Sequence, residues 1–209
     1  MTGFDFVFAL FSLILGLAVA EVLGGFAMVM KLHARARAGK AKDVRVGWLV
    51  PLLATYVTLN QLSFWMTGYA ARDSLPFSYI TLLAVLVIVG AYYLFSVLVF
   101  PDEPEDWPDF DVWYDQNNRF ILIGLTVINL LVQVATAQVR PAATPEQTAA
   151  FEALGAGMWI LVFGVWLQIV LLIVLIFVKR RWLNAVLLAL LSLMTVAAAG
   201  YVAYAGLVF

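Results

Sequence analysis

One acidic residue, Glu21, lies well inside a long apolar stretch and has the chemistry to hold a proton or a cation. It stands in the segment LGLAVAEVLGG, ten residues before Lys31. Helical spacing places its carboxyl group about 15 Å below that basic residue, near the middle of a membrane. A carboxylate is costly there unless it is protonated, paired or hydrated. Glu21 is therefore a candidate ion or proton site, and the alternative is a protonated side chain that hydrogen-bonds to a neighbouring helix.

Four amide side chains are the candidate partners of Glu21 in such a site. They are Asn60, Gln61, Asn129 and Gln133. The last two share one helical face with two threonines, and lipid does not accept a face of this kind. Together the amides could line a polar path, or they could join helices through ordinary hydrogen bonds.

Small residues recur at every fourth position of the first apolar stretch. The stripe consists of Ser12, Gly16, Ala20 and Gly24. Small residues at this spacing let another helix approach closely, so we assign the stripe to helix packing. It predicts that the first helix is central in the bundle.

Six apolar runs are long enough to cross about 30 Å of hydrocarbon as helices. They cover Phe4–Met30, Trp48–Tyr69, Phe77–Phe100, Phe120–Val139, Leu154–Val178 and Trp182–Leu207. The runs are continuously apolar, whereas barrel strands would alternate over about ten residues. The links between them are short, so we expect residues 1–209 to form a single all-α transmembrane bundle of about six spans.

Basic residues predict the orientation of this bundle. The first, third and fifth links carry ten of the 12 Lys and Arg residues, and the opposite side has only Arg72 and Arg140. Cytoplasmic links are enriched in basic residues, so both termini should face outward. Such a bundle is embedded in a membrane, so membrane lipid is its expected surrounding partner.

The third link, PDEPEDWPDFDVWYDQNNR, is strongly acidic. Its seven acids are Asp102, Glu103, Glu105, Asp106, Asp109, Asp111 and Asp115. We predict that they contact the basic first or fifth link, and the alternative is that they bind a divalent cation or a partner protein. The prolines exclude a helix through its first half, and a short interfacial helix is predicted after Pro108. The link has no EF-hand spacing, so the sequence does not indicate which metal it would bind.

Composition narrows the class of function further. Hydrophobic residues make up 65% of the chain, charged residues 12%, and cysteine is absent. The formal net charge of −1 gives no indication of nucleic acid binding. No Walker, G-x-S-x-G or H-E-x-x-H motif appears, which makes an enzyme the weaker interpretation and leaves catalytic residues and cofactors without candidates.

The opening FDFVFALFSLILGLAVAEVLGGFA and the LVFPD that ends the third run resemble a group of small uncharacterised bacterial inner-membrane proteins. The resemblance implies about six spans, a location in the bacterial inner (cytoplasmic) membrane and no particular function. Three hypotheses remain. The first is a small transporter or channel that uses Glu21 and the polar helix faces. The second is a non-catalytic subunit or sensor that binds partner helices, either in a homo-oligomer or with another membrane protein. The third is a membrane enzyme that acts on lipid.

Overall fold

The computed structural model describes residues 3–39, 44–71, 78–139 and 156–204. Its helices are α1 (Gly3–Arg37), α2 (Leu49–Ala70), α3 (Tyr79–Val99), α4 (Phe110–Val139), α6 (Ala156–Phe177) and α7 (Arg181–Tyr204). A 3-10 turn, η1 (Pro104–Asp106), interrupts the third link. Each helix overlaps one predicted apolar run, and α1 and α4 extend beyond theirs, so the all-helical class is confirmed.

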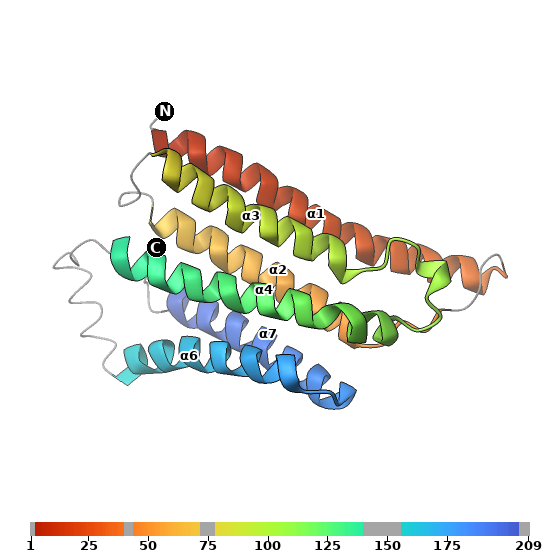
Figure 1. The fold of residues 1–209 in the computed structure, drawn as a ribbon. Helices are drawn as coiled ribbons and strands as arrows, with labels where there is room; N and C mark the ends of the chain where they lie inside the picture. The colour runs from red at the N-terminus through yellow and green to blue at the C-terminus, as the bar shows by residue number, and fades with distance from the viewer. Residues whose placement is uncertain (1–2, 40–43, 72–77, 140–155, 205–209) are drawn as a thin grey trace.

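The central helix of the bundle is α2, which contacts α1, α3, α4 and α7. At one edge α1 packs against α3 and α2, and at the other α6 packs against α4 and α7. Figure 1 shows α1 and α6 on opposite sides of the bundle. The prediction of a central first helix is therefore wrong. The small residues that suggested it do not identify which helix the others surround.

Four helices, α1, α3, α4 and α7, are long and apolar enough to cross a membrane. The central helix α2 is not among them, and part of its surface, including Leu62, Met66 and Tyr69, is exposed. The helix α6 has 22 residues, and the stretch that qualifies as apolar within it is Val162–Phe177. The fold is compatible with an integral membrane protein.

The start of α4 differs from the prediction of a separate interfacial helix. It begins at Phe110 and continues without a break, and the rings of Phe110 and Tyr114 are buried in the core. The backbone of Arg45 fixes this arrangement, because its N–H donates to Pro108 (2.9 Å) and its carbonyl accepts from Phe110 (3.0 Å). The aromatic residues therefore pack inward instead of lying in a membrane interface.

The third and fifth links and the described part of the first link lie at one end of the bundle, which we call the basic end. Figure 1 shows the C-terminal ends of α1 and α6 at this end, and the start of α1 and the end of α7 at the other. Four of the basic residues that defined the predicted orientation lie outside the described residues: Lys40, Lys42, Arg72 and Arg140.

Candidate functional site

Glu21 lies on the outside of α1. The buried face of this helix consists of residues such as Phe11, Leu15, Ala18 and Val22, which pack into the bundle. The side chain of Glu21 is exposed, and no hydrogen bond or ion pair joins it to the part of the chain that the structure describes. The structure therefore does not join Glu21 to the four amides in one site.

Two of the amides meet each other between α2 and α4. The Asn129 side-chain nitrogen donates to the Asn60 side-chain oxygen at 2.9 Å. Each amide also donates to its own helix, Asn60 to the carbonyl of Tyr56 and Asn129 to that of Leu125. This geometry matches an interhelical contact in which the polar groups are satisfied by protein.

Gln61 connects α2 with α3. Its side-chain nitrogen donates to the hydroxyl of Ser96 at 2.6 Å, and that hydroxyl donates to the carbonyl of Tyr92. The side chain is fully buried, and its oxygen has no hydrogen-bond partner. Gln133 lies apart from these contacts, half-buried on α4, and its backbone carbonyl accepts from the Thr136 hydroxyl.

The stripe of small residues has two different surroundings along α1. Near the start of the helix, Ser12 accepts a hydrogen bond of 3.0 Å from the indole nitrogen of Trp65 on α2. Farther along, Gly16, Ala20 and Gly24 are exposed. A Cβ added at either glycine would meet no neighbouring atom within 4 Å. Most of the stripe is thus an open surface on which a helix backbone could approach closely.

Ion pairs at the basic end confirm that the acidic link contacts the basic links. Arg35 of the first link pairs with Glu105 at 3.1 Å. Arg181 of the fifth link pairs with Asp115 at 2.7 Å, and with Asp109 at 3.5 Å. These side chains are partly exposed, so each pair contributes only about 0–1 kcal/mol. Among the described residues no group of three or more His, Asp or Glu side chains is arranged to hold a metal ion.

Asp111 has a structural role that the sequence did not suggest. It is only 8% exposed, and its carboxylate lies against Gly47, just before α2 begins at Leu49. A negative charge there interacts favourably with the free backbone N–H groups at the start of this helix, where the local N-cap residue Trp48 provides no side-chain bond. A Cβ at Gly47 would overlap the carboxylate, which explains the glycine. The sequence alone does not reveal this role, because it depends on the start of α4 lying beside the start of α2.

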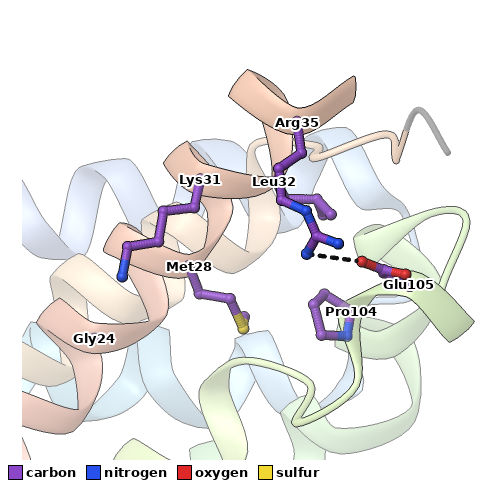
Figure 2. A pocket seen from close by; sticks show the side chains of 7 residues that line it. All are labelled: Gly24, Met28, Lys31, Leu32, Arg35, Pro104 and Glu105. Carbon is purple, nitrogen blue, oxygen red and sulfur yellow. Dashed lines mark ion pairs between the residues drawn. The ribbon is translucent and has the colours of Figure 1, made fainter. Parts of the chain in front are cut away.

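The larger of two described cavities, about 240 Å³, lies where α1 faces η1 (Figure 2). The second, about 10 Å³, lies between α1 and α3 among apolar side chains. Glu21 and the four amides line neither of them.

These features define a class: a helical bundle compatible with the membrane, whose interior amides hydrogen-bond to protein and whose one mid-helix carboxyl group faces outward. The chain matches no protein-family model, no curated protein and no solved structure. The resemblance to small bacterial inner-membrane proteins stays a prediction.

Proposed function

We propose that the chain is a multi-pass protein of the bacterial inner membrane, with six spans and both termini outside. Four helices have the length and hydropathy of spans, and α2 lies between four other helices. The basic links lie together at one end of the bundle, as the excess of basic residues on cytoplasmic links requires.

Within this class, the function that the geometry favours is non-catalytic association through the outer face of α1. The observation that carries this proposal is that Glu21 lies beside exposed small residues on a face that the rest of the described chain leaves open. A carboxyl group near mid-membrane is unfavourable in contact with lipid. A partner helix seated on Gly16 and Ala20 would bring hydrogen-bonding groups to it.

A second copy of this chain is the occupant to which the proposal commits. In a parallel pair of α1 helices the two Glu21 side chains lie at the same depth, where the two carboxyl groups can share a hydrogen bond. The other helices offer no Lys or Arg at that depth, since Arg119 and Lys179 stand at the ends of apolar runs. The stripe is also present on both copies, so the same small residues would meet across a two-fold axis.

Transport through the bundle remains the alternative, and it would require a wet path between Glu21 and the amides. Asn60 and Asn129 instead bond to each other, and Gln61 bonds to Ser96. These contacts favour association over transport. A lipid-modifying enzyme has no residue arrangement in its support.

Cysteine cross-linking tests the association, because the natural chain contains no cysteine. Ala20→Cys in native membranes should form a disulfide-linked species of twice 23.1 kDa under mild oxidation. Leu193→Cys is the control, since it is 65% exposed on α7 and lies outside the proposed contact. A cross-link to a different protein, or equal dimer yield from both variants, would contradict pairing of two copies through α1.

A further inference from the structure

The larger cavity lies at the basic end of α1, on the open side of that helix. Gly24, Met28, Lys31 and Arg35 line it from successive turns of α1, and Leu32 lies beside them. Pro104 and Glu105 of η1 form the opposite wall (Figure 2). Its volume of about 240 Å³ is below the roughly 300–1,000 Å³ typical of sites that enclose a drug-sized ligand. It therefore suits a small group or a headgroup better than a whole organic ligand.

The charges around this cavity favour an anion. Lys31 and Arg35 contribute two positive charges, and Glu105 contributes one negative charge. Arg35 is engaged with Glu105 at 3.1 Å, whereas Lys31 forms no ion pair with the residues that the structure describes. Figure 2 shows Lys31 and Arg35 extending from α1, with Met28 between them and Glu105 across the cavity near Arg35. The ammonium of Lys31 is the available cation, away from the repelling carboxylate.

One end of the cavity is lined by charged residues and the other end by apolar residues. Lys31 and Arg35 follow the apolar run of α1, while Met28 and Gly24 are one and two turns back within it. Gly24 has open space where a side chain would be, because a Cβ there meets nothing within 4 Å. A ligand that fills this cavity needs a negative head beside Lys31 and an apolar part over Gly24.

We propose that this cavity binds the phosphate headgroup of an anionic phospholipid, with Lys31 contacting the phosphate and one acyl chain crossing Gly24. Lysine is a common phosphate ligand, and basic residues next to a membrane span attract anionic lipid. The site rests on the proposed membrane insertion. It is compatible with pairing of α1, because helices that cross at small residues at about −40° diverge toward their ends.

Lipid binding to the purified full-length chain in detergent tests this site, with bound lipids counted by native mass spectrometry. Phosphatidylglycerol should bind more tightly than phosphatidylcholine, and Lys31→Gln should weaken phosphatidylglycerol binding about fivefold. Gly24→Leu, which keeps every charge but fills the apolar part, should weaken it as well. Lys179→Gln removes an exposed cation at the same end, outside the cavity, and should leave binding unchanged.

Three results would overturn the proposal. Equal losses in Lys31→Gln and Lys179→Gln would indicate diffuse attraction without a site. Displacement of phosphatidylglycerol by millimolar inorganic phosphate would mean that phosphate alone is the ligand. Unchanged binding in both Lys31→Gln and Gly24→Leu would exclude this cavity.

Thermal unfolding verifies that each variant is folded, with Lys31→Arg as a charge-preserving control. Cross-linking of Ala20→Cys in the same preparation reports α1 pairing separately, so failure of either proposal is distinguishable.

Discussion

The side-chain nitrogen of Asn129 donates to the side-chain oxygen of Asn60 at 2.9 Å, which joins α4 to the central helix α2. Asn129→Leu removes the donor, so the buried side-chain oxygen of Asn60 loses this hydrogen bond. We expect a loss of about 0.6–2 kcal/mol in the free energy of unfolding, measured by denaturant titration in detergent. The double variant Asn60→Leu with Asn129→Leu should recover part of that loss, because neither partner is then left unsatisfied. Additive losses would contradict a direct coupling between the two residues.

Whether such amides face each other, a water path or Glu21 could not be predicted from the sequence. The six helices could be predicted, because each apolar run is long and bounded by charged or turn-forming residues. The outward position of Glu21 was not predictable, since most of α1 is apolar around its whole circumference. In a membrane both the packed face and the lipid face are apolar, so periodicity does not separate them.

The buried position of Asp111 shows a second limit of sequence reasoning. Asp111 belongs to an acidic link in which seven carboxyl groups look alike, and it is the one that is buried against Gly47 at the start of α2. That selection depends on the backbone pairing of Arg45 with Pro108 and Phe110, residues far apart in the chain. By contrast, the general attraction between the acidic and basic links followed from charge alone.

Asp111 should be distinguishable from its acidic neighbours by substitution. Asp111→Asn keeps the shape of the side chain and an oxygen acceptor beside the start of α2, so the thermal stability in detergent should change little. Asp111→Ala removes this buried polar side chain from the start of α2 and should lower the free energy of unfolding by about 0.5–2 kcal/mol. Asp102→Ala is the control, because Asp102 is exposed at the surface of the same link. Equal effects of the two alanine variants would show that only the charge of the link matters.

Close packing of α3 against α4 depends on Gly124. The ring of Phe95 occupies the position where a Cβ on residue 124 would lie. The same ring packs edge-on against the ring of Phe120, with 5.9 Å between the ring centroids. Gly124→Ala must displace this buried ring and should destabilise the bundle by about 1–3 kcal/mol. Gly90→Ala on α3 is the matched control, because a Cβ there meets nothing within 4 Å. Similar melting temperatures for the two variants would mean that the ring moves aside without cost.

The orientation in the membrane is tested with reporters that are active only outside the cytoplasm. A reporter fused after Phe209 should be active, and one inserted within Ala38–Lys42 should be inactive, because ten of the 12 basic residues lie on the side of the first link. An active reporter in the first link would contradict the six-span topology with both termini outside.

The central claim, that Glu21 on the outer face of α1 joins two copies of the chain, is tested most directly by the dimer fraction in liposomes. Single-molecule photobleaching measures this fraction at decreasing ratios of protein to lipid. Glu21→Gln can still donate and accept a hydrogen bond, so its dimer affinity should match that of the unmodified chain. Glu21→Leu should dimerise about fivefold more weakly, the effect of losing a hydrogen bond of about 1 kcal/mol. Unchanged dimerisation of a folded Glu21→Leu protein would contradict the account.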